Sequence, residues 1–77
     1  MANEQRSSLT YMANQIADNL RHGATSEEAA VEQIHNHMEK FWARPMKRRI
    51  VADLDTTAAE LDPLARRAVE RLATKHA

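Results

Sequence analysis

The residues best suited to bind a charged partner lie in one short stretch, where Trp42 is followed by Arg44, Lys47 and Arg48. A guanidinium group donates forked, charge-assisted hydrogen bonds to carboxylates and phosphates, and an indole ring can stack on another flat ring. Two interpretations stay open. The stretch is either a docking surface, or a corner in which Trp42 belongs to the core and the basic side chains lie in solvent or contact an acidic patch.

A second group of candidate binding residues, Tyr11, Asn14 and Gln15, lies nearer the N-terminus. Tyr11 is about 160–200° away from the centre of the apolar stripe of its predicted helix, so we expect an exposed ring, which is a mild signal of an interface. The amides of Asn14 and Gln15 flank the stripe and either face solvent or hydrogen-bond the backbone of a partner. These three residues therefore join the basic stretch as candidates for partner contact.

Neither a metal site nor a catalytic group is predicted. His35 and His37 are two residues apart, so on a helix they point to different sides and cannot share one ion. His37 lies beside the apolar stripe near Phe41, and we expect it to be a partly buried packing residue. The chain has no cysteine, its serines stand near predicted helix starts, and no glycine-rich turn could hold a phosphate. We expect the chain not to be an enzyme by itself.

Helix signals divide the chain into segments that position these candidates. A cap at Ser7 or Ser8 is expected to begin the first helix, and Gly23 is expected to end it in the left-handed conformation. Thr25 and Glu28 have the spacing of a capping box, which predicts the start of the second helix. The apolar stripes that should form the core include Leu9, Met12, Ala13, Ile16 and Leu20 on the first helix and Ala30, Val31, Ile34, Met38, Phe41 and Trp42 on the second.

Pro45 and Pro63 predict the starts of two further helices, because the N–H that proline lacks would be unpaired at a first helical position anyway. Between them, residues 56–61 lose the helical period and form either a loop or an extra turn. The predicted helices span about residues 8–22, 26–43, 45–55 and 63–74, and residues 1–7 are expected to be a disordered tail. The fold class is therefore all-α, a single small compact bundle of about four short helices.

The composition of the chain limits the classes of partner that it can bind. A chain of 77 residues with 43% hydrophobic but only 4% aromatic residues should have a shallow core, which favours association with a partner or a homodimer. Eleven basic residues balance eleven acidic ones, so general binding of nucleic acid is not expected. No apolar run is long enough to cross or enter a membrane, and we expect a cytoplasmic protein with no membrane partner.

Three short motifs together give the chain a family resemblance. Residues 12–17 read MANQIA, residues 37–42 read HMEKFW, and residues 61–64 read LDPL. In this order and separation they resemble the delta subunit of NAD-dependent formate dehydrogenase, over about residues 9–72. The resemblance implies a small cytoplasmic accessory protein that binds no cofactor stably and whose partner is the catalytic subunit of a molybdenum formate dehydrogenase. Such a protein would be a minor subunit or an assembly factor that supports formation of the active enzyme.

The resemblance also implies a possible transient contact with the bis-guanine dinucleotide form of the molybdenum cofactor. Arg44, Lys47 and Arg48 would then bind its pyrophosphate, and Trp42 would stack on its purine. Two alternative functions stay open on the sequence alone: a generic helical protein–protein interaction module, and a small nucleic-acid-binding protein that uses the basic turn. Net neutrality argues against the second.

Overall fold

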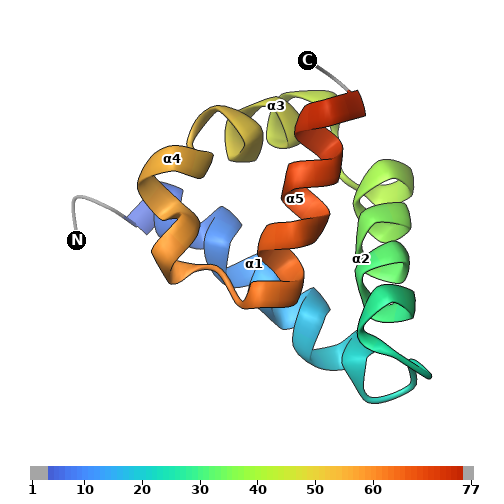
Figure 1. The fold of residues 1–77 in the computed structure, drawn as a ribbon. Coiled ribbons are helices and arrows are strands. Elements are labelled where there is room, and N and C mark those ends of the chain that lie inside the picture. Colours follow the sequence, from blue (N-terminus) through green and yellow to red (C-terminus); the bar gives the residue numbers. More distant parts are fainter. Residues whose placement is uncertain (1–3, 76–77) are drawn as a thin grey trace.

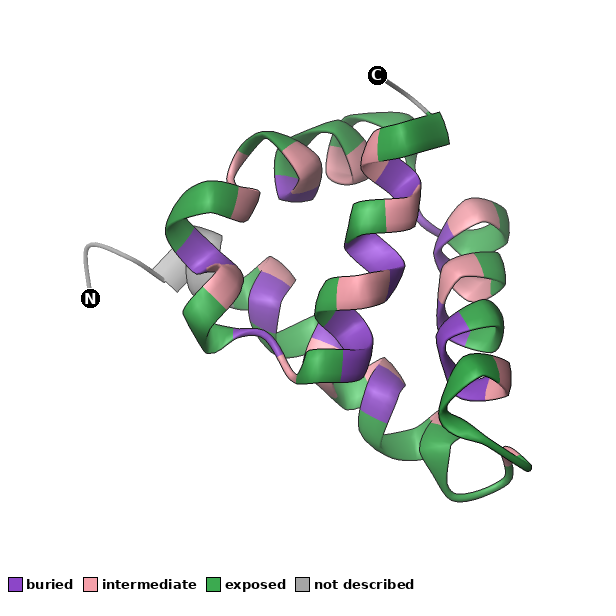
Figure 2. Ribbon diagram, in the orientation of Figure 1, coloured by how far each residue is buried: buried purple, intermediate pink, exposed green. Residues whose placement is uncertain are grey.

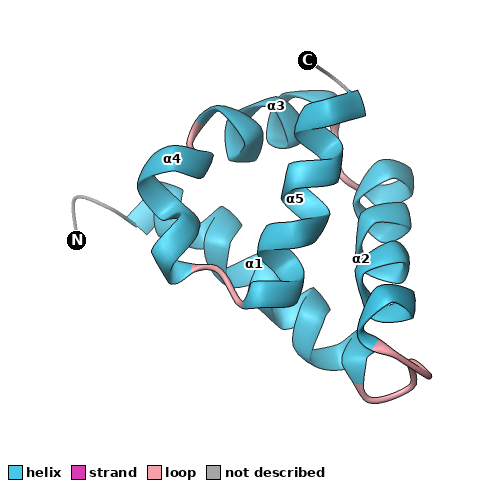
Figure 3. Ribbon diagram, in the orientation of Figure 1, coloured by secondary structure: helices cyan, strands magenta, loops and turns pink. Residues whose placement is uncertain are grey.

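The computed structural model describes residues 4–75, with side chains from residue 8 onward, and every regular element in that part of the chain is a helix (Figure 3). The elements are α1 (Glu4–Arg21), α2 (Glu27–Phe41), α3 (Arg44–Ala52), α4 (Leu54–Thr57), the 3₁₀ turn η1 (Ala58–Glu60) and α5 (Pro63–Lys75). The all-α prediction is confirmed. The described part has five α-helices rather than about four, because α4 was not predicted as a separate helix.

Helices α2 and α5 lie side by side, α1 passes behind the first part of α5, and α3 runs along the other end of the pair (Figure 1). The buried residues face the space between these helices (Figure 2). Much of this core is alanine, which lets the helix backbones approach closely, and a few large side chains fill the remaining space. The buried hydrophobic residues are Ala13, Ala17, Ala30, Val31, Ile34, Met38, Trp42, Ile50, Leu61, Leu64, Ala65, Ala68, Val69 and Leu72.

Helix α5 begins where the sequence predicts. The Asp62 carboxylate accepts a hydrogen bond from the Leu64 N–H at 2.9 Å, and Pro63 occupies the first helical position. The first N–H groups of a helix have no partner within it. The aspartate accepts from one of them, and the proline has no N–H that would need a partner. The five buried residues of α5 recur at helical spacing, so this helix packs with one continuous apolar face.

The start of α1 differs from the prediction. The helix begins at Glu4, so Ser7 and Ser8 lie within it, the predicted cap at either serine is wrong, and residues 4–7 are helical rather than a disordered tail. The residues before the serines, Glu4, Gln5 and Arg6, are of types with high helix propensity, so the helix extends through them. The rest of the predicted tail, residues 1–3, lies outside the described residues.

The start of α2 lies one residue beyond the predicted capping box. Ser26 has an extended backbone (φ −159°, ψ 169°), and its Oγ accepts a hydrogen bond from the Ala29 N–H at 3.1 Å. The predicted cap at Thr25 is therefore wrong. Thr25 and Ser26 are adjacent residues of the same capping type, and the chain uses the second of them.

Gly23 does not have the left-handed conformation that we predicted, since the described residues include no positive φ. A Cβ atom built on Gly23 would meet no heavy atom within 4 Å. Alanine should therefore fit the native backbone while restricting the unfolded chain. We expect Gly23→Ala to raise the free energy of unfolding by about 0.4–1 kcal/mol. Urea denaturation would measure it, and a lower midpoint at unchanged m-value would contradict the structure at this turn.

The predicted helix over 45–55 is interrupted at Asp53. This residue lies between the two helices, as the cap at the end of α3 and at the start of α4. Its carbonyl oxygen accepts hydrogen bonds from the hydroxyls of both Thr56 and Thr57 at 2.9 Å. Thr57 is buried, so its hydroxyl needs such a partner. The connection over 56–61, which the sequence left open, is thus the end of α4 followed by η1 and the Leu61 turn into α5.

An exposed cluster joins the start of α2 to the outer face of α5. The Glu28 carboxylate accepts hydrogen bonds from Arg67 and, at 3.0 Å, from Arg71. The hydrogen bond and the positive charge of Arg67 lower the pKa of Glu28 below its ordinary value, and Arg71 adds a smaller effect. Solvent screens exposed ion pairs, so those of Glu28 with Arg67 and Arg71 contribute little to the free energy of unfolding. Their effect is mainly to orient α2 against α5.

Candidate functional site

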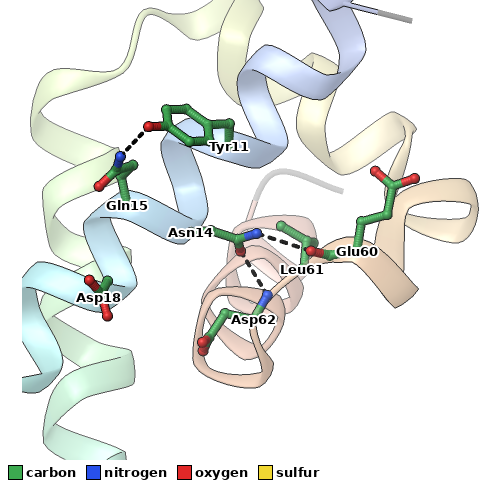
Figure 4. A pocket seen from close by; sticks show the side chains of 7 residues that line it. All are labelled: Tyr11, Asn14, Gln15, Asp18, Glu60, Leu61 and Asp62. Carbon is green, nitrogen blue, oxygen red and sulfur yellow. Dashed lines mark hydrogen bonds between the residues drawn. The ribbon is translucent and has the colours of Figure 1, made fainter.

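One candidate site is a groove between α1 and the turn that leads into α5, which we call the amide groove (Figure 4). Its volume is about 470 Å³. All three upstream candidates, Tyr11, Asn14 and Gln15, line it. The residues around the groove are Tyr11, Asn14, Gln15, Asp18, Glu60, Leu61 and Asp62.

Asn14 ties the two walls of the amide groove together. Its Nδ2 donates a hydrogen bond to the Glu60 carbonyl at 3.0 Å, and its Oδ1 accepts one from the Asp62 N–H at 2.7 Å (Figure 4). We predicted that this amide would face solvent or bind the backbone of a partner. Instead it binds the backbone of its own chain, 46 and 48 residues away. Asn14 is therefore a structural residue of the groove, which fixes the turn before α5.

The other two amide-groove candidates are exposed. The Tyr11 ring is exposed as predicted, and its hydroxyl accepts a hydrogen bond from Gln15 Nε2 one helical turn later. Asp18, which lies on the same helix, and Glu60 make no ion pair among the described residues, while Asp62 pairs with Arg21. The groove consequently has an acidic rim beside one exposed phenol.

The second candidate site is the turn between α2 and α3, which we call the basic corner and define by residues 40–48. Trp42 is 6% exposed, so the interpretation that places it in the core is confirmed. Its backbone leaves the helix with extended angles (φ −84°, ψ 135°), while its N–H still donates to the Met38 carbonyl at 3.0 Å. The side chain thereby closes the end of the core between α2 and α3.

Phe41 has the opposite environment, because it is 71% exposed although we predicted it on the inner stripe. That prediction is wrong: the inward position at this end of α2 is filled by Trp42. The Phe41 ring packs instead on His37 of the preceding turn, with 4.8 Å between ring centroids. His37 is partly buried beside Phe41, as the sequence predicted.

The three basic candidates of the corner have two different roles. The Lys47 side chain is only 13% exposed, and its Nζ donates to the carbonyl oxygen of Glu39 at 3.2 Å and to its carboxylate at 3.4 Å. Lys47 therefore holds α3 against α2. Arg44 and Arg48 are exposed and make no ion pair or hydrogen bond with any described residue. These two remain available to a partner.

A purine-stacking site is not formed at the corner, because the ring that would supply it is covered. Stacking on Trp42 would require the end of the core to open, and Lys47 is already bonded to Glu39. The residues present thus do not fit a guanine dinucleotide arm, and we derive no step through the cofactor. Across residues 8–75, no three His, Asp or Glu side chains converge as metal ligands would.

None of the described helices combines the length and the apolar character that a membrane span needs. Comparison with curated proteins and with solved structures gives no match. The family model of the NADH-dependent formate dehydrogenase delta subunit, FdsD, matches residues 8–69, which contain both the amide groove and the basic corner. Because that match covers most of the 77 residues, the chain belongs to the formate dehydrogenase delta-subunit family.

Proposed function

We propose that this chain is a non-catalytic accessory subunit, located in the cytoplasm, that binds the catalytic subunit of a formate dehydrogenase and supports formation of the active molybdenum enzyme. The observation that carries the proposal is the delta-subunit family match over residues 8–69. The name of that family places such subunits with an oxidoreductase, whose chemistry would reside in another chain.

The surface of the molecule supports a binding role. An exposed aromatic ring and unpaired basic side chains stand at the basic corner, and an exposed phenol stands beside the acidic rim of the amide groove. Both sites include residues of helices that pack in the common core, which fixes the backbone of each site before a partner arrives. Rigid placement of a few exposed side chains suits recognition of a protein surface.

A gene deletion tests this proposal. We expect a strain that lacks the gene to express the catalytic subunit normally but to show lower formate dehydrogenase activity per milligram of that subunit. The molybdenum content of the purified enzyme separates the two modes of support. A lowered content indicates a role in assembly, whereas a normal content with low activity indicates a stable subunit that activates the enzyme.

Expression of the wild-type gene from a plasmid is the control and should restore the activity. Unchanged specific activity in the deletion strain, with unchanged molybdenum content, would refute the proposal.

A further inference from the structure

The basic side chains of residues 8–75 divide into paired and unpaired ones. The paired set among the described residues is Arg21, Lys47, Arg49, Arg66, Arg67, Arg71 and Lys75, each within ion-pair distance of a carboxylate. Lys40, Arg44 and Arg48 have no such partner in the described part of the chain. The three cations that are unpaired among residues 8–75 thus all lie in the basic corner, residues 40–48.

Arg44 and Arg48 are four residues apart on α3, so they lie on the same side of the helix about one turn apart. Arg44 is also the first residue of α3, at the positive end of the helix dipole, and the first turn has no acidic residue. A cation is unfavourable at that position. Neither arginine thus contributes a hydrogen bond or an ion pair to the described part of the fold, and the charge of Arg44 is unfavourable at the start of α3.

Phe41 lies three residues before Arg44, so the connecting backbone keeps their Cα atoms within roughly 11 Å of each other. Its ring is the most exposed of the large hydrophobic side chains in the described part of the chain. An exposed aromatic ring within a few residues of two unpaired arginines has the residue types of a binding hot spot, in which aromatic and arginine anchors become buried against the partner.

We infer that Phe41, Arg44 and Arg48 form a docking surface for an acidic surface segment of the formate dehydrogenase catalytic subunit. The segment would present two carboxylates to the arginines and an apolar side chain to Phe41. Charge complementarity selects this partner, because a guanidinium pairs best with a planar carboxylate and the chain leaves these two guanidinium groups unpaired. The inference rests on the proposed function, since it assigns that function to one face of the molecule.

The test measures binding to the formate dehydrogenase complex purified from a strain that lacks this chain. We expect Arg44→Glu with Arg48→Glu to raise the Kd at least about tenfold, since like charges would face each other in a desolvated interface. Phe41→Ala should raise the Kd by about tenfold as well. Arg44→Gln with Arg48→Gln should weaken binding less and make it less sensitive to salt, because it removes attraction without adding repulsion.

The control variant, Arg66→Glu with Arg71→Glu, makes the same change in net charge at two positions of α5 whose partners, Glu70 and Glu28, lie outside the basic corner. It should change the Kd by no more than about twofold, as expected for charges outside the interface. Helicity and thermal midpoint serve as the folding readout. Because Arg44→Glu places an anion at the start of α3, the double reversal should not lower the thermal midpoint.

The outcomes separate the inference from the function on which it rests. If the wild-type chain binds the complex and the double reversal binds equally well, the docking surface is wrong while the accessory function stands. If the wild-type chain does not bind at all, both are overturned. Two further outcomes would show that the basic corner serves another partner, and each requires that the double reversal leave binding to the complex intact. In the first, the double reversal abolishes retention on a single-stranded oligonucleotide. In the second, it converts a dimer of this chain to a monomer in light scattering.

Discussion

Met38→Ala is expected to lower the free energy of unfolding by about 2–5 kcal/mol, the usual range for truncating a fully buried large side chain. Met38 is 0% exposed and lies on the face of α2 that packs in the common core. Removing its side chain deletes apolar contact area and leaves a cavity in the packed core. A domain of this size has a total stability of only about 4–12 kcal/mol, so the loss could unfold much of the population.

Met12→Ala is the matched control, because the same side chain is truncated at a site that is 39% exposed. The sequence places both methionines on inner apolar stripes, whereas the structure separates them. We therefore expect the control variant to lower the free energy of unfolding by less than about 1 kcal/mol. Urea denaturation followed by circular dichroism measures both variants. Equal losses in the two variants would show that Met12 is as buried as Met38, against this structure.

Asn14→Ala is the second variant for which we expect a large effect, a decrease of about 1–3 kcal/mol in the free energy of unfolding. The alanine variant leaves the Glu60 carbonyl and the Asp62 N–H without the amide that now binds both. Each hydrogen bond is worth about 1 kcal/mol, and an unsatisfied group that stays partly buried costs more. The same denaturation experiment gives the value. Amide exchange at Asp62 should also become faster, because its N–H loses the acceptor.

Gln15→Ala is the control for Asn14. Its amide is adjacent in sequence but exposed, and its only hydrogen bond among the described residues joins the Tyr11 hydroxyl on the same helix. This variant should change the stability by no more than about 0.5 kcal/mol. A loss as large as that of Asn14→Ala would mean that the stability comes from α1 itself and not from the link between α1 and the α5 turn.

Local signals were sufficient where a residue acts on its own helix. The aspartate and proline before α5 predict its start because both act on donors within one turn. The same logic could not separate Thr25 from Ser26, since either hydroxyl can cap α2 and the choice depends on how the chain leaves α1. The conformation of Gly23 belongs to the same turn, and a flexible residue permits a left-handed backbone without requiring it.

The basic corner could be located from the sequence, but its two aromatic residues could not be told apart. A helical wheel assigns each residue a direction only while the helix continues. Trp42 stands one residue beyond α2, where the extended backbone turns its ring into the core and leaves Phe41 outside. The partners of Asn14 were equally inaccessible, because both are backbone groups more than forty residues away and leave no trace in side-chain spacing.

The position of α5 in the chain has a consequence for synthesis. Helices α1, α2 and α3 all pack against α5, which follows them in the sequence. While the ribosome produces the chain from its N-terminus, α1 and α2 can pack on each other, but the parts of the earlier helices that pack on α5 stay uncovered until residues 63–72 emerge. A premature stop codon between α3 and α5 would yield a product that contains the whole basic corner yet lacks the five core residues that α5 supplies. Proteases should remove such a product quickly, because they cleave chains that do not pack.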